Sequence, residues 1–180
     1  MHFELETAPT GRRARVERLL GEMDERLAGP KRASARARLD KSAYAGKVWV
    51  TRERPYVDRL ASFWLVRRYI DPAARIAFLG SKERIERGGE RVFFDMAGGD
   101  FTHQDGLITF EAMIAAFGLA GAGLARLAAT VRAIDLKEED DQARAIRDVI
   151  DGLVLLAKDD LDLVDRALDV FDALHATYNR

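Results

Sequence analysis

Three aspartates and one histidine lie at sequence positions where side chains commonly form a site in α/β proteins. Asp95 ends an apolar segment with the composition of a strand, and His103 lies in the turn-rich loop that follows it. Ligands in open α/β sheets bind beyond the carboxyl ends of the strands, so both residues have the expected position. Asp58 lies early in the helix predicted after the first strand. Asp135 ends a later helix, where its charge opposes the helix dipole by about 0.5 kcal/mol, and this cost favours a functional role.

Carboxylate oxygen and imidazole nitrogen form a hard, mixed ligand set that suits a divalent ion such as Mn²⁺, Fe²⁺ or Zn²⁺. The sequence contains no cysteine, which excludes disulfides, thiolate ligands and cysteine nucleophiles. A shared ion about 2.0–2.2 Å from each ligand requires the ligand atoms of Asp58, Asp95 and His103 to lie within about 5 Å of one another. Asp135 is the fourth candidate ligand, and Glu111 is a fifth, weaker one.

Each of these residues also has a structural interpretation. Asp58 and Glu111, each near a predicted helix N-terminus, can complement the helix dipole. Asp95 can cap a turn, and Asp135 can cap the helix that follows it. His103 is one of only three histidines in the chain, so its proximity to acids can arise by chance.

Arginines are dense around the junction between the first predicted strand and its helix, at Arg52, Arg54, Arg59, Arg67 and Arg68. A guanidinium group offers paired N–H donors that fit a tetrahedral oxyanion such as phosphate, sulfate or chromate. Arg52, Arg59 and Arg68 are the candidate anion-binding residues. The alternative is that these arginines solvate helix faces or pair with nearby acids, as surface arginines commonly do.

Several common catalytic motifs are missing. The sequence contains no GxGxxG, Walker A, HExxH or GxSxG pattern. Dinucleotide-binding, nucleotide-hydrolysing and serine-hydrolase functions therefore lack their usual sequence support.

Three short segments that have the composition of strands are expected to position the candidate site residues. Residues 48–51, 75–79 and 91–95 are rich in β-branched and aromatic side chains. Between the first two, Pro55 suits the first position of a helix, and Asp71-Pro72 ends that helix. A short helix capped by Ser81 is predicted over residues 81–87. Strands that alternate with helices predict βαβ units and a small, mostly parallel sheet of about three strands.

The second half of the chain is predicted to be helical. After the loop that ends near Gly106, apolar residues recur at helical spacing in four segments, namely 110–117, 124–134, 143–157 and 161–178. The predicted fold class is therefore α/β, predominantly helical.

The charge distribution divides the chain into a basic arm or linker, residues 1–45, and a domain, residues 46–180. The arm has an apolar stripe at helical spacing that ends at Gly29-Pro30, and most of its charges are basic. The segment 135–172 is rich in acids and can attract the arm. The arm lacks interleaved aromatic residues, so we expect at most weak, nonspecific binding to duplex DNA that falls steeply with salt.

Composition indicates a globular cytoplasmic protein. The chain has 180 residues, of which 48% are hydrophobic, enough for one core. The first residues lack the basic and apolar regions of a signal peptide, and no apolar run approaches the ~20 residues of a membrane span. We therefore expect no membrane association. The sequence leaves the oligomeric state open, including a homo-oligomer.

Several multi-residue blocks occur in a characteristic order, namely Trp49–Arg52, Arg54–Ser62, Trp64–Pro72, Phe94-Asp95, Phe101–His103, Thr109–Glu111 and Asp172–Leu174. Together they resemble the chromate-resistance protein family (ChrB type), over about residues 40–180. The resemblance implies a role in chromate resistance and the stress response, where family members are described as chromate-responsive regulators of an efflux operon. Full-length members carry an additional N-terminal domain that resembles a winged-helix regulator. This chain has the basic arm there, so sequence-specific DNA binding is not expected of this chain alone.

A weaker similarity concerns the metal. Asp58, Asp95 and the pair His103-Gln104 resemble a reduced form of the pattern of the DHH-type phosphoesterases, in which such residues bind Mn²⁺. Thr102 replaces an expected aspartate and Gln104 an expected histidine, so a single metal ion fits better than a two-metal centre. The similarity implies Asp58, Asp95 and His103 as ligands, with Asp135 as a fourth.

Three functions follow from these observations. The first is an accessory or sensor domain for chromate resistance, with a pocket that binds a metal ion or a tetrahedral oxyanion such as chromate. The second is a metal-dependent hydrolase of a phosphorylated small molecule, in which the metal activates water. The third is a helical interaction module without chemistry.

Overall fold

The computed structural model describes residues 38–180. Most of the predicted basic arm, and the helix expected in it, lies outside the described residues. Residues 38–45 contact the domain. The Leu39 amide donates to the Ala116 carbonyl at 2.9 Å. The short 3₁₀ helix η1 (Lys41–Tyr44) places the Tyr44 ring against Phe117, with ring centroids 5.0 Å apart.

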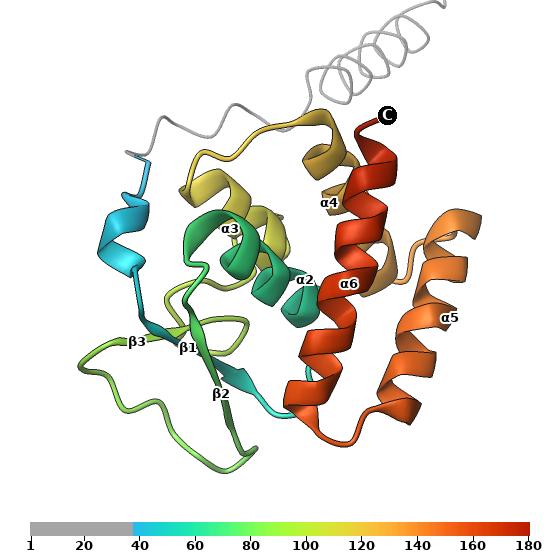
Figure 1. Ribbon diagram of the computed structural model, residues 1–180. Coiled ribbons are helices and arrows are strands. Elements are labelled where there is room, and N and C mark those ends of the chain that lie inside the picture. The colour runs from blue at the N-terminus through green and yellow to red at the C-terminus, as the bar shows by residue number, and fades with distance from the viewer. Residues whose placement is uncertain (1–37) are drawn as a thin grey trace, which may run out of the picture. The chain divides into compact units, whose positions relative to one another are not determined.

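The sheet has three parallel strands in the order β2-β1-β3. They are β1 (Val48–Arg52), β2 (Arg75–Leu79) and β3 (Arg91–Phe93). Val50 in the central strand is in register with Ala77 on one side and Phe93 on the other. The predicted α/β fold, predominantly helical with a small parallel sheet, is confirmed. Because all strands are parallel, their carboxyl ends meet at one edge of the sheet (Figure 1).

Helix α2 (Val57–Leu65) follows β1 and is buried along most of its length, because apolar side chains occupy nearly all of its positions. It continues as a π-helical turn, η2 (Val66–Ile70). The Asp71 amide closes this turn on the Val66 carbonyl at 2.8 Å. The helix ends before Pro72, as the sequence predicted, because the residue before a proline avoids the α region.

The helix predicted over residues 81–87 is wrong. The segment forms a turn at Ser81 and then irregular backbone. The guanidinium group of Arg52 accounts for the difference, because its Nη1 donates to the Gly80 and Glu83 carbonyls at 2.6 and 2.7 Å. A helix would use the Glu83 carbonyl for its own hydrogen bond. Ile85 is also the only large apolar side chain in the segment, so a helix there would have no apolar face to bury.

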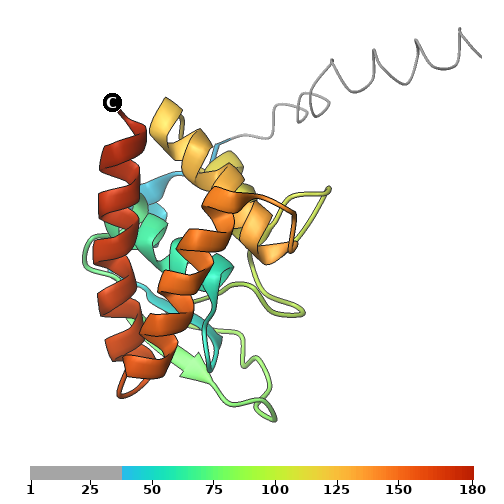
Figure 2. The same cartoon turned by 90° about the vertical axis from the view of Figure 1, so that its right-hand side faces the viewer.

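Four helices complete the domain. They are α3 (Thr109–Ala116), α4 (Ala122–Asp135), α5 (Asp141–Leu156) and α6 (Asp160–Tyr178). Two begin with a local aspartate cap, since Asp140 accepts from the Ala143 amide and Asp159 from the Asp162 amide. Helix α6 packs against α2, α4 and α5, and α5 and α6 run side by side in both views (Figures 1 and 2). No helix within residues 38–180 is long and apolar enough to cross a membrane.

The hydrophobic core lies between the sheet and the helices, and it is rich in aromatic side chains. Phe63 of α2 is fully buried, as are Trp49 and Phe94, and the Phe63 and Phe94 rings meet edge to face with their centroids 4.8 Å apart. Trp64 and Phe171 extend the core between α2 and α6. The start of α2, which bears Asp58, is therefore held by the largest packed region of the molecule.

Asp172 links α6 to the end of α2 through hydrogen bonds and an ion pair. Its carboxylate accepts from the Trp64 indole nitrogen at 2.7 Å and from both the Nε and Nη2 atoms of Arg68. Trp64 is 1% exposed, so its N–H group has little access to water as an alternative partner.

Replacing Asp172 by alanine is expected to lower the free energy of unfolding by about 1–2 kcal/mol. The buried indole N–H of Trp64 loses its acceptor, and the exposed ion pair with Arg68 adds little. Urea unfolding of the variant measures the loss. Asp169→Ala, on the solvent side of the same helix, is the matched control and should stay within about 0.5 kcal/mol of wild type. Equal losses in the two variants would show that the Trp64 contact is not the cause.

Candidate metal centre

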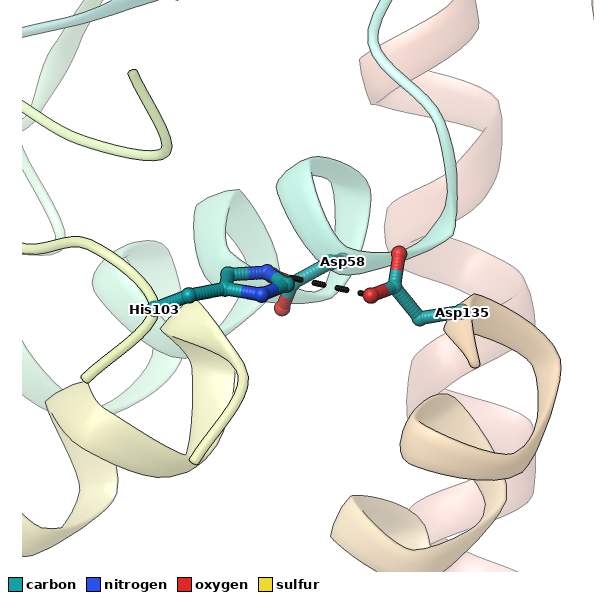
Figure 3. A group of neighbouring side chains, drawn as sticks. All are labelled: Asp58, His103 and Asp135. Carbon is teal, nitrogen blue, oxygen red and sulfur yellow. Dashed lines mark hydrogen bonds and ion pairs between the residues drawn. The ribbon is translucent and has the colours of Figure 1, made fainter. Parts of the chain in front are cut away.

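Four elements bring the candidate ligands together. Asp58 lies in the first turn of α2, Asp95 directly follows β3, His103 lies in the loop before α3, and Asp135 is the last residue of α4. The Nε2 atom of His103 is 3.0 Å from Asp58 Oδ2, 3.6 Å from Asp95 Oδ1 and 3.7 Å from Asp135 Oδ2. The distances from His103 to the aspartates agree with the expected convergence. Figure 3 shows the imidazole ring directed from its loop toward Asp58 and Asp135.

Asp58 has a structural role as well as a place in this cluster. The side chain is 3% exposed. Its Oδ1 accepts from the Phe110 amide at 2.8 Å, and its Oδ2 accepts from the Thr109 amide at 3.0 Å. These amides are in the first turn of α3, where backbone N–H groups have no partner within the helix. Asp58 therefore caps α3 from another helix, while Oδ2 also faces His103.

Asp95 is held by two other side chains. Its Oδ2 accepts from Arg59 Nε at 2.7 Å, and its Oδ1 accepts from the Thr109 hydroxyl at 2.9 Å. The backbone of Asp95 has a φ of +49°, a left-handed conformation that aspartate tolerates better than most residues. Asp95 lies outside the group of candidate ligand atoms that are closest to one another. The ligand atoms of Asp58, His103 and Asp135 all lie within 4.8 Å of one another.

Asp135 differs from the other two aspartates because its carboxylate accepts no hydrogen bond from any residue between 38 and 180. Its ionic contact within that part of the chain is the one to His103. The side chain is 24% exposed and lies at the C-terminus of α4, where the helix dipole disfavours a negative charge. Within the described residues, the groups that favour this carboxylate are the charges of His103 and Arg59, and burial outweighs them.

Burial and mutual repulsion disfavour the charged forms of the Asp58 and Asp135 carboxylates. Burial raises the pKa of Asp58 to about 6, the Phe110 amide opposes this shift, and the carboxylates of Asp95 and Asp135 add to it. Burial also raises the pKa of Asp135, with His103 opposing and Asp95 adding to the shift. Bringing a cation among these carboxylates would relieve both the burial cost and the mutual repulsion.

The separations fit one ion without a large movement. Two ligand atoms each about 2.1 Å from one metal lie about 3.0–3.4 Å apart in octahedral or tetrahedral geometry. The distance from His103 Nε2 to Asp58 Oδ2 is 3.0 Å, and that to Asp135 Oδ2 is 3.7 Å. A small rotation of Asp135, which no hydrogen bond within the described chain restrains, would bring its Oδ2 atom into this range of His103 Nε2. The role of these residues as ligands stays a prediction.

The three arginines predicted to bind an anion have three separate sets of partners. Arg52 donates to the carbonyls of Gly80 and Glu83, Arg59 donates to Asp95, and Arg68 donates to Asp172. Among residues 38–180, no partner is shared between them. Arg59 alone contacts the candidate metal cluster, through Asp95. Their role in anion binding stays a prediction.

Glu111 and Arg132 support the loop that bears His103. Glu111 Oε2 accepts from the Ile108 amide at 3.1 Å and from Arg132 Nη1 at 2.7 Å. The same Arg132 nitrogen donates to the Gly106 carbonyl at 2.9 Å. Arg132 therefore ties α4, which bears Asp135, to the loop that bears His103. Sequence reasoning missed Arg132, although its spacing of three residues from Asp135 puts both on one helix face.

Comparison with known proteins identifies the family. The family model of the ChrB C-terminal domain matches residues 49–178, a range that contains all four candidate ligands. Protein ChrB of Cupriavidus metallidurans is 33% identical over 144 residues, which are 79% of this chain and 44% of that relative. The chain thus spans less than half the length of this curated relative. No solved structure matches the chain. Because the family match covers well over half of the sequence, the chain belongs to the ChrB C-terminal domain family.

Proposed function

We propose that this domain acts in chromate resistance as an accessory or sensor domain and binds one divalent metal ion through Asp58, His103 and Asp135. The observation that supports the metal is the convergence of their ligand atoms within 4.8 Å. Membership of the ChrB C-terminal domain family supports the connection with chromate resistance.

A single ion fits better than a pair. The group of converging ligand atoms within the described residues consists of Asp58, His103 and Asp135, and Asp95 beside it is paired with Arg59. The positive charge of Arg59 also lies on the side of the cluster where a second cation would have to bind, and like charges repel. Mixed nitrogen and oxygen ligands favour Mn²⁺, Fe²⁺ or Zn²⁺.

A second candidate function, metal-dependent hydrolysis of a phosphorylated small molecule, is favoured by the exposure of the cluster. The His103 side chain is 48% exposed, so an ion bound beside it would keep open positions for water and substrate. A metal with an open position lowers the pKa of its bound water and makes it a nucleophile. Release of phosphate from a generic aryl phosphate in the presence of Mn²⁺, lost in His103→Ala, would favour this function over a purely sensory one.

Calorimetric titration of the EDTA-treated protein with Mn²⁺ and Zn²⁺ tests the metal proposal. We expect saturation near one ion per chain. His103→Ala should weaken binding tenfold or more, because the only nitrogen ligand of the cluster is lost. The matched control is Gln104→Ala, an exposed neighbour in the same loop, which should bind as wild type does. An absence of binding heat in wild type, or equal affinities in both variants, would favour an interaction module without a metal.

A further inference from the structure

A hollow lies where the carboxyl ends of the three strands meet, and the candidate metal cluster shares none of its lining residues. It measures about 530 Å³. Arg52 at the end of β1, the segment 83–87 after β2, and Ala97-Gly98 after β3 contribute to its wall. Parallel sheets bind ligands at this edge. The volume is within the range typical of sites for small organic molecules and is far larger than one tetrahedral oxyanion needs.

The wall of this hollow is positively charged. Three guanidinium groups, those of Arg52, Arg84 and Arg87, face one carboxylate, that of Glu83. The Glu83 carboxylate is already engaged, because its Oε2 accepts from the Gly80 amide at 2.6 Å. Arg84 has no hydrogen-bond or ion-pair partner within residues 38–180. Arg87 is paired with Asp100 at 3.1 Å, so the charge that the hollow offers an anion without a competing partner within the described residues is that of Arg84.

Two of the guanidinium groups are held in place without using all of their donors. Arg52 binds the Gly80 and Glu83 carbonyls through Nη1, and its other nitrogens have no described partner. Arg87 donates to the Gly98 carbonyl and to Asp100. Fixing a donor before the ligand arrives lowers the entropic cost of binding. Arg84 is exposed and adds a third, unpaired charge.

An apolar surface adjoins this charged wall. On the other side of Glu83 and Arg84 a second hollow, of about 610 Å³, is lined by apolar residues of the sheet, among them Ala77 and Leu79, and also by Glu86 and Arg91. Parallel sheets normally have both faces covered. Here, within the described chain, Ile85 and the buried Met96 cover Val50 and Phe93 on that face, and Ala77 and Leu79 stay partly exposed. The two hollows together provide a subsite that can bind an anionic group and, next to it, a partly apolar subsite.

We propose that the carboxyl-end hollow binds a small organic anion whose phosphate, sulfonate or carboxylate group contacts Arg52, Arg84 and Arg87. The apolar part of the ligand lies against Ala77 and Leu79, which are partly exposed. The site is independent of the metal proposal, because it uses different residues and requires no ion.

Fluorescence titration with 8-anilinonaphthalene-1-sulfonate in EDTA tests this site, since the probe combines a sulfonate with flat rings. We expect saturable binding to the folded domain and displacement by inorganic pyrophosphate, which competes for the arginines alone. Arg84→Gln should weaken probe binding about tenfold, because a charge-assisted contact is lost. Arg84 has no described partner, so the variant should fold normally. Arg144→Gln, on the exposed side of α5, is the matched control and should bind the probe as wild type does.

Amide chemical shifts locate the probe. Binding should shift the amides of residues 83–87, 97 and 98 and leave those of Asp58 and His103 unchanged. Probe binding that pyrophosphate does not displace, equal affinity in Arg84→Gln and Arg144→Gln, or shifts confined to other regions would each overturn the proposal. The presence of EDTA keeps this result separate from the metal titration, so one proposal can fail while the other holds.

Discussion

Replacing Asp135 by asparagine is expected to stabilise the metal-free domain and to weaken metal binding strongly. Asp135 accepts no hydrogen bond within the described chain, lies at the C-terminus of α4 and faces other carboxylates. Removing its charge should raise the free energy of unfolding by about 0.5–1 kcal/mol. The same change removes a charged ligand, so metal affinity should fall by about 100-fold or more, since even outer-shell partners are worth about 10–100-fold. Urea unfolding in EDTA measures the first effect, and calorimetry measures the second.

A gain in stability together with a loss of metal affinity would identify Asp135 as a functional carboxylate. A structural carboxylate stabilises the fold, whereas one retained for binding lowers stability until its ligand arrives. Asp141→Asn is the matched control, because Asp141 is a nearby acid that is almost fully exposed at the start of α5. It should leave metal affinity unchanged and lower stability slightly, since a negative charge is favourable at a helix N-terminus. If Asp135→Asn binds metal like wild type, Asp135 is not a ligand.

The features predictable from sequence were those that depend on local pattern. The β-branched and aromatic runs of the three strands and the helix that starts near Pro55 are of this kind. The approach of His103 to Asp58 and Asp95 was also predictable, because parallel strands place their following loops at one edge of a sheet. Each inference needed only neighbouring residues and a rule of α/β topology.

The features that sequence could not provide depend on contacts between distant residues. Arginine density suggested one anion clamp, yet Arg68 binds Asp172, which lies 104 positions away. The helix predicted over residues 81–87 does not form, because Arg52 donates to backbone carbonyls at the start of that segment. A pattern of residue types shows how many charges a segment has. It does not show which partner each charge meets, because the fold decides that.

The capping of α3 by Asp58 is a further example, and it separates the two roles of this residue. A cap is normally read from the residues just before a helix, such as Asp140 before α5. Ile108 precedes α3 and has no polar side chain, so local sequence suggests an uncapped helix. The acceptor comes from 51 and 52 positions away. Asp58 supports the fold and also faces the candidate metal site. Removing it should therefore lower the free energy of unfolding, whereas removing the charge of Asp135 should raise it.

Asp58→Ala is accordingly expected to lower the free energy of unfolding of the metal-free protein by about 2 kcal/mol at pH 7.5. The buried amides of Thr109 and Phe110 lose their acceptor, at about 1–3 kcal/mol each. Loss of a buried negative charge offsets part of this. Because the folded pKa of Asp58 is raised to about 6, its protonation adds stability that is complete below the unfolded pKa and is lost as pH rises through 6. The loss on mutation should therefore be about 1 kcal/mol larger at pH 5 than at pH 7.5.

Hydrogen exchange identifies which contact is lost. In Asp58→Ala the amides of Thr109 and Phe110 should exchange faster than in wild type at both pH values, because the first turn of α3 no longer has an acceptor. Asp140→Ala is the matched control, since it removes a local cap from α5. It should cost about 1 kcal/mol and leave the Thr109 and Phe110 amides protected. Unchanged exchange at these two amides in Asp58→Ala would mean that the carboxylate does not cap α3. The proposed metal would then be the one role left for Asp58.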